Sequence, residues 1–141
     1  MKNYTLALVV GFVFAASQVA IAQVVVVVGS KSTASALSTE QAAALFLGKS
    51  DQLPGVGTAL LLDQPESNPV REQFYSKVAN KSGAQVKAAW SRLVFSGKGT
   101  PPKELTSSAE VKKMVTNNAN AIGYIEKSAV DASVKVLVSV D

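Results

Sequence analysis

The chain has 141 residues, of which 48% are hydrophobic and 17% charged, proportions that exclude a disordered chain and fit one globular domain. It contains no Cys and no His, so the core must hold the fold without disulfides, and the most common metal ligand and general base are both missing. The formal net charge of +4 comes from scattered residues with no basic run and no interleaved aromatics, which excludes a nucleic-acid groove and mildly favours small anions.

Residues 1–22 are predicted to be a secretory signal peptide. Lys2 supplies a short positive region, residues 6–16 are almost wholly apolar, and Ala20-Ile21-Ala22 is a small-x-small cleavage signal before Gln23. A membrane anchor is the alternative, although the apolar core is short for a full span. We therefore expect an exported chain whose single α/β domain covers residues 23–141.

The domain begins with an unbroken valine run, residues 24–28, which predicts a strand buried on both faces. A polar loop follows, so Ser30 stands at the carboxyl end of that strand, where open α/β sheets place their ligands. A plain connector is an equally good interpretation of this loop. The next helix is expected to start at Ser38, which has capping-box spacing to Gln41, and to end at Gly48 in the left-handed conformation.

A second apolar run, residues 59–62, predicts another buried strand, and a helix begins soon afterwards at Pro69. Ser67 or Asn68 can cap this helix. Its unpaired backbone N–H groups and its positive dipole end would suit an anion, and Arg71 in the first turn would add a planar, doubly donating guanidinium. The alternative is an ordinary capped helix with a solvated arginine.

The remaining elements follow in order. A helix carries its apolar stripe on Val86, Trp90, Leu93 and Val94, so Trp90 is expected in the core. The loop at 96–102 holds Lys98 between two glycines, a pattern that can wrap an anion or serve as a hinge.

A further helix is expected after the capping box from Ser107 to Glu110. Strands are expected at 121–125 and at 134–140, where four valines alternate with Lys135, Leu137 and Ser139, which predicts a half-buried edge strand with these three side chains facing away from the core. The whole order predicts a layered α/β sandwich in which helices flank a mixed sheet.

Three segments together resemble one family, the phosphate-binding proteins that serve bacterial ABC importers. Leu45-Phe46-Leu47-Gly48-Lys49 is similar to the family's "IFLGK" signature, and Trp90 followed by Phe95-Ser96-Gly97-Lys98-Gly99 resembles its Trp-to-glycine-loop segment. Ala121-Ile122-Gly123-Tyr124-Ile125 is similar to its "AIGYV" strand. The three motifs occur in family order, and the similarity covers roughly residues 24–126.

The resemblance implies the type II periplasmic binding protein fold, in which two α/β lobes hold phosphate in the cleft between them. This chain would form only the second lobe, as in the short single-lobe proteins grouped with that family. It implies a periplasmic solute-binding protein without a cofactor, whose ligand is phosphate or a related oxyanion. A membrane transporter, a sensor or a second copy of the chain would be its protein partner.

The matching segment departs from the family pattern of an Arg at the strand end and Ser-Gly-Thr at the helix start. Ser67 matches the Ser, Asn68-Pro69 replaces Gly-Thr, and Asp63 stands near the place of the Arg. Asp63 and Glu66 would repel a dianion, since two like charges about 4 Å apart near a surface cost roughly 4 kcal/mol. Arg71 would compensate for this charge. The candidate ligand-binding residues are Ser30, Ser67, Asn68, Arg71 and Lys98.

Two other functions compete with anion binding. The chain could be an interaction or accessory protein, a lobe that has lost its ligand and docks another protein, in which case an exposed apolar patch is expected. An enzyme is the third candidate. Without His or Cys it would need a Ser–Lys or carboxylate pair, and nothing pairs Asp63 or Glu66 with a base or a metal. The sequence therefore predicts a protein that is not an enzyme.

Overall fold

The structure is a computed structural model that describes residue 11 and residues 23–140. Within them a five-stranded sheet has the strand order β5-β4-β6-β1-β7. β1 runs antiparallel to β6 and β7, whereas β4 runs parallel to β5 and β6, so the predicted mixed sheet is confirmed. The predicted signal peptide, apart from Gly11, lies outside the described residues.

The strands of the sheet are β1 (Val24–Gly29), β4 (Leu60–Asp63), β5 (Lys103–Glu104), β6 (Ala121–Glu126) and β7 (Val134–Val140). A separate two-stranded ribbon pairs β2 (Gln52–Leu53) with β3 (Gly57–Thr58). The helices are α1 (Thr39–Phe46), α2 (Pro69–Ala79), α3 (Gly83–Phe95) and α4 (Ser108–Asn117), with a 3₁₀ turn at Lys127–Ala129. The sequence prediction missed β2, β3 and β5. None of the helices between residues 23 and 140 has the length and apolar character that crossing a bilayer needs.

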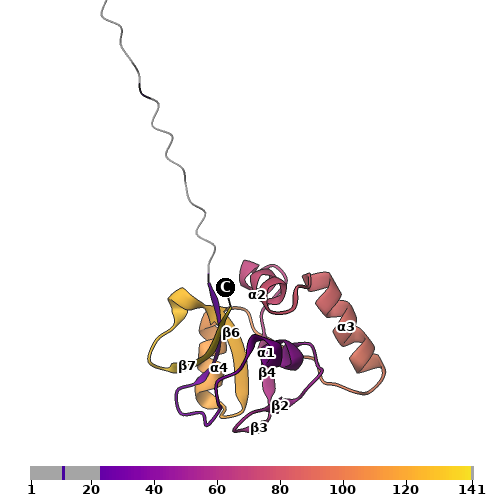
Figure 1. The fold of residues 1–141 in the computed structure, drawn as a ribbon, viewed down its shortest axis with the longest axis horizontal. Helices are drawn as coiled ribbons and strands as arrows, with labels where there is room; N and C mark the ends of the chain where they lie inside the picture. Colours follow the sequence, from indigo (N-terminus) through magenta and orange to yellow (C-terminus); the bar gives the residue numbers. More distant parts are fainter. Residues whose placement is uncertain (1–10, 12–22, 141) are drawn as a thin grey trace, which may run out of the picture.

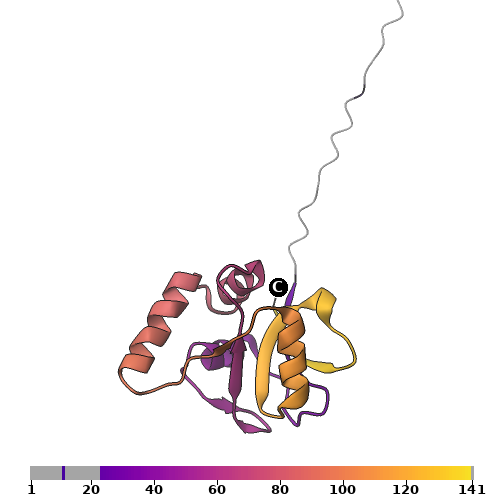
Figure 2. The same ribbon diagram turned by 180° about the vertical axis from the view of Figure 1, so that it is seen from behind.

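Helices cover both faces of the sheet. Figure 1 shows α1 and α2 over one face, and Figure 2, seen from behind, shows α4 over the other. β1 therefore packs on both sides: Val24, Val26 and Val28 join the core under α1 and α2. Val25 and Val27 join the core under α4. All five valines are at most 1% exposed, which confirms the prediction of a strand buried on both faces.

Two glycines allow α4 to lie close to the sheet. A Cβ atom on Gly29 would lie 2.4 Å from the backbone oxygen of Val115, and one on Gly123 would lie 2.6 Å from Val111 Cγ1. Neither distance is possible for real atoms, so a side chain at either place would push the helix away. Close packing of helix and sheet thus depends on these two residues.

β7 lies at the edge of the sheet, as predicted, but its side chains do not alternate as predicted. Val26 pairs with Val138 and Val27 pairs with Val136, so Leu137 is an extra residue, a β-bulge. Because the bulge shifts the two-residue period by one, Leu137 is buried whereas Val136 is 39% exposed. The prediction that Leu137 faces away from the core is wrong.

The helix ends largely confirm the sequence prediction. Ser38 and Gln41 form the expected capping box, and Gly48 has a φ of 74° at the end of α1. Asn68 caps α2, with Pro69 as its first residue. At α4 the Ser107 side chain accepts from Glu110 N–H, but the Glu110 carboxylate accepts from Thr106 N–H instead of closing the box on Ser107.

α3 lies at the side of the domain (Figure 1) and buries only part of its predicted stripe. Val86 and Trp90 are buried, and Trp90 Nε1 donates to the Phe46 carbonyl at 2.8 Å, so Trp90 belongs to the core as predicted. Val94 is 47% exposed and Phe95 is 95% exposed. The prediction that Val94 belongs to the apolar stripe on the core side is wrong, because no element among the described residues covers the last turn of this helix.

Candidate functional site

Asp63 at the carboxyl end of β4 is a buried carboxylate surrounded by donors. It is 4% exposed. Its Oδ1 accepts from the Tyr124 hydroxyl and from Gln64 N–H at 2.9 Å. Its Oδ2 accepts from the Tyr75 hydroxyl at 2.7 Å and lies 3.1 Å from Arg71 NH1. Four donors thus satisfy one charge, as a buried carboxylate requires.

Arg71 completes the ion pair from the first turn of α2. It is 7% exposed, its NH1 also donates to the Gln64 carbonyl at 3.1 Å, and its guanidinium lies 5.3 Å from the centre of the Tyr75 ring. Its Nε is buried without a hydrogen-bond partner in the structure. A buried N–H that lacks an acceptor is costly, so this atom marks part of the cost of burying the ion pair.

The two tyrosines stay protonated under ordinary conditions. Burial, followed by the nearby charge of Asp63, raises the pKa of Tyr75 well above its usual value. The same two causes, in the same order, raise the pKa of Tyr124. Both hydroxyls therefore remain donors that hold the Asp63 carboxylate.

Gln64 ties this cluster to the start of α2. It is fully buried, its Nε2 donates to the Tyr124 carbonyl at 2.9 Å and to Ser108 Oγ at 3.2 Å, and its Oε1 accepts from the Asn68 amide at 2.7 Å. The Asn68 amide group is therefore engaged inside the protein. Ser67, its neighbour, is exposed.

The first turn of α2 does not present the expected free N–H groups. Asn68 N–H donates to the Pro65 carbonyl at 2.9 Å and Arg71 N–H donates to the Asn68 carbonyl at 3.1 Å. Val70 N–H donates to Asn68 Oδ1 at 3.3 Å, and Pro69 has no N–H. The expected open anion cradle is absent from this turn, and the role of Ser67 and Asn68 as ligand donors stays a prediction.

A pocket of about 460 Å³ lies beside the ion pair, between α2, α3 and the segment that leads into β5. Its wall combines charged and apolar side chains. Its lining residues are Asp63, Arg71, Lys87, Trp90, Ser91, Val94, Phe95, Pro101, Pro102 and Glu104. Concave sites of this volume with a few convergent polar groups are the usual form of small-ligand sites.

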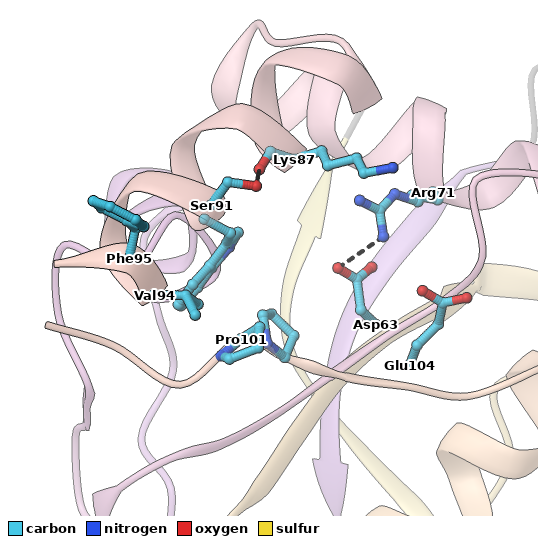
Figure 3. A pocket seen from close by; sticks show the side chains of 10 residues that line it. Asp63, Arg71, Lys87, Ser91, Val94, Phe95, Pro101 and Glu104 are labelled. Atoms are coloured by element: carbon cyan, nitrogen blue, oxygen red, sulfur yellow. Dashed lines mark hydrogen bonds and ion pairs between the residues drawn. The ribbon is translucent and has the colours of Figure 1, made fainter. Parts of the chain in front are cut away.

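The charges occupy one end of this pocket. Figure 3 shows the Lys87 side chain extending from α3 toward the Arg71 guanidinium, with the carboxylates of Asp63 and Glu104 below them. Within residues 23–140, Arg71 pairs with Asp63, whereas Lys87 and Glu104 form no ion pair. Lys87 is therefore a cation available to a ligand. Among the same residues, no three His, Cys, Asp or Glu side chains gather closely enough to hold a metal ion.

The structure does not bring Ser30 to Arg71. Because β1 is antiparallel to β6 while β4 is parallel to it, the carboxyl ends of β1 and β4 lie at opposite ends of the sheet. Ser30 instead lines a separate hollow with Thr116 of α4 and neighbouring loop residues. The expectation that both strands end beside one ligand assumed parallel strands, and the antiparallel pairing overturns it.

Lys98 lies in the loop after α3 and lines a different pocket, with Gly97, Gly99 and Lys103. Among the predicted candidates, only Arg71 lines the pocket beside Asp63.

Sequence reasoning missed Lys87 altogether and gave no role to Tyr75 or Tyr124. The only local signal was the position of Tyr75, one turn after Arg71 on the same face of α2. Tyr124 is 61 residues from Asp63, and no sequence spacing reveals that contact.

Comparisons with known proteins find similarity only in structure. No model of a protein family and no curated protein matches the chain. Solved structures do match over 82% of this chain. One is described as a phosphate ABC transporter substrate-binding protein with bound phosphate from Clostridium perfringens (TM-score 0.65, 19% identity), of which 44% is covered.

Two further structures are similar over the same 82% of this chain. One is an ABC-type phosphate transport receptor from Vibrio cholerae, with a TM-score of 0.65, 20% identity and 45% of its chain covered. The other is PstS from Borrelia burgdorferi, with a TM-score of 0.61, 12% identity and 46% of its chain covered.

The chain therefore spans less than half the length of the structures that it matches. The likeness confirms the predicted fold, a single α/β lobe of the periplasmic-binding-protein type with a mixed sheet. The descriptions of these structures name a substrate-binding protein and a transport receptor. At these identities the likeness establishes the fold alone, and the ligand has to be argued from the pocket.

Proposed function

We propose that this chain binds a small oxyanion, with inorganic phosphate as the first candidate, in the pocket beside Arg71 and Lys87. The observation that carries the proposal is the pair of cations in one pocket: Arg71, held in place by Asp63, and Lys87, which forms no ion pair within residues 23–140. The fold of the similar phosphate transport receptors supports the choice of phosphate. The predicted signal peptide would place the protein in the periplasm as a solute-binding component.

The Asp63 cluster would orient Arg71 for this role. The ion pair, the Gln64 carbonyl and the ring of Tyr75 all hold the guanidinium, so little side-chain entropy is left to lose on binding. The Arg71 guanidinium can then attract an anion into the pocket, and Lys87 can reach the same anion from α3. Ser30 and Lys98 are not part of this proposal because they line other pockets.

Binding is expected to be weak. Two cations and two carboxylates line the pocket, so its formal charge is zero, and Asp63 and Glu104 oppose a dianion. The part of the chain that matches also covers only 44% of such a structure, so one lobe leaves the ligand open to water. We expect a Kd near millimolar, which corresponds to about 4 kcal/mol.

Titration with phosphate, followed by calorimetry and by amide NMR shifts, tests the proposal. We expect shifts around Arg71 and at least a threefold loss of affinity in Lys87→Gln, as removal of one exposed charge implies. Lys113→Gln is the matched control, because Lys113 is an exposed lysine on α4, across the sheet. No heat and no shifts at tens of millimolar phosphate would refute the proposal.

A second candidate function is an interaction module, as the sequence also allowed. The observation that favours it is the exposed end of α3, where Phe95 is 95% and Val94 is 47% exposed. A second copy, a membrane transporter or a membrane sensor could cover this surface. Sedimentation of the wild type and of Phe95→Asp tests the second copy: self-association that the variant loses supports it, and a monomer at all concentrations argues against it.

A further inference from the structure

The pocket beside Arg71 has an apolar end that a bare inorganic ion would not use. Trp90, Val94 and Phe95 of α3 and Pro101 and Pro102 of the following loop line the pocket there. Figure 3 shows Val94 and Phe95 at the far left of the view, away from the cations. We propose that the natural ligand is an organic phosphate monoester, an anionic group attached to an apolar body. This inference rests on the proposed oxyanion site.

The size of the pocket supports an organic ligand. Its volume of about 460 Å³ lies within the roughly 300–1,000 Å³ of pockets for organic molecules. A single water occupies only about 30 Å³ of liquid volume, so an ion of a few heavy atoms would leave most of the pocket filled with water. A ligand with an apolar body would displace that water from apolar side chains.

The placement of the side chains on α3 defines the shape of such a ligand. Lys87, Ser91, Val94 and Phe95 follow the spacing of one helix face, and all four line the pocket. At 1.5 Å rise per residue, Lys87 and Phe95 are separated by about 12 Å along the helix axis. A ligand with its phosphate at Arg71 and Lys87 would therefore direct its apolar part along α3 toward Phe95.

Glu104 restricts the ligand to one anionic group. Its carboxylate lies on the side of the pocket where Asp63 already contributes a negative charge (Figure 3). A diphosphate at this end of the pocket would bring more negative charge to the two carboxylates than Arg71 and Lys87 compensate. A monoester with an uncharged body avoids that repulsion.

The test compares inorganic phosphate, phenyl phosphate and phenol as ligands of the full chain. We expect phenyl phosphate to bind about tenfold tighter than inorganic phosphate, since partial burial of a phenyl ring is worth about that factor. In Phe95→Ala the ratio of the two affinities should fall to about threefold. Phe95 is almost fully exposed, so this variant should fold. Val130→Ala, at an exposed valine outside the pocket, is the control and should keep the ratio.

The outcomes separate the two proposals. Equal affinity for inorganic and phenyl phosphate, or a ratio that Phe95→Ala leaves intact, would overturn the organic ligand while the oxyanion site stands. Phenol binding as tightly as phenyl phosphate would show that the cations play no part, which overturns both proposals. Failure of all three ligands to bind also overturns both.

Discussion

Asp63→Asn is the sharpest test of the buried cluster. The substitution keeps the shape of the side chain but leaves one carbonyl oxygen where the carboxylate has two. Either the Tyr124 hydroxyl and Gln64 N–H, or the Tyr75 hydroxyl and Arg71, must then face an amide NH₂ group. A tyrosine hydroxyl can turn and accept from that group, but the Gln64 N–H and the Arg71 guanidinium can only donate, so at least one buried donor loses its acceptor.

The expected loss of stability follows from these contacts. Each buried donor left without an acceptor costs about 1–3 kcal/mol, and removing one partner of a buried ion pair costs about 3–5 kcal/mol. We therefore expect Asp63→Asn to lower the free energy of unfolding by about 3–5 kcal/mol. That is a large part of the roughly 5–15 kcal/mol that a domain has, and it should lower the Tm by at least about 10 °C.

Urea unfolding followed by circular dichroism measures this change. Asp51→Asn, at an exposed aspartate in the loop before β2, is the matched control and should change stability by less than about 0.5 kcal/mol. Arg71→Met and the double variant complete a cycle, in which we expect a coupling energy of at least about 1 kcal/mol. A loss below about 1 kcal/mol in Asp63→Asn would refute the reasoning, because a buried donor cannot lose its acceptor, and Arg71 its counterion, at so little cost.

Three further outcomes follow from other parts of the fold. Burial raises the pKa of Tyr75 and Tyr124 above the ordinary value near 10, so the unfolded chain loses these protons at a lower pH than the folded chain. The free energy of unfolding should therefore be constant in this respect below pH ~10 and should fall as the pH rises above ~10. Above this pH, the free energy of unfolding should fall by up to about 1.4 kcal/mol per pH unit for each tyrosine. Tyr75→Phe should halve this slope, and a variant with the slope of the wild type would contradict the role of Tyr75. Gly29→Ala should cost about 1–3 kcal/mol in urea because its Cβ meets the Val115 carbonyl, and a neutral result would show that α4 can move. Ser82→Ala removes the capping box of α3 and should lower the stability of the helix by about 1 kcal/mol. Hydrogen exchange should then show faster exchange of the amides in the first turn of α3, and unchanged protection of these amides would contradict the role of the cap.

The local elements could be predicted because their causes are local. The Ser38–Gln41 box and the Asn68 cap each satisfy backbone groups within four residues, so their spacing is visible in the chain. The two faces of β1 were also predictable, since five successive valines leave no polar side for water. β5 could not be predicted, because two polar residues, Lys103 and Glu104, become a strand only when they pair with β4.

The candidate site was predicted only in part. Arg71 was found because it stands in the first turn of a helix that follows a buried strand. Its partners were not, because Tyr124 comes from a strand 61 residues away from Asp63 and Lys87 comes from α3. Ser30 was misplaced for the same kind of reason: the direction of β1 in the sheet decides where its end lies, and a single strand does not encode its neighbours.

The amino-acid order alone determined where helices start and stop, which strands are buried, and that the domain is an α/β lobe, because capping, side-chain size and hydrophobic period act over a few residues. Only the tertiary structure decided that four donors surround Asp63, that Leu137 turns inward at a bulge, and that Arg71 and Lys87 share a pocket with apolar residues of α3. Those outcomes depend on strand direction and on contacts between segments far apart in the chain, which local interactions do not specify.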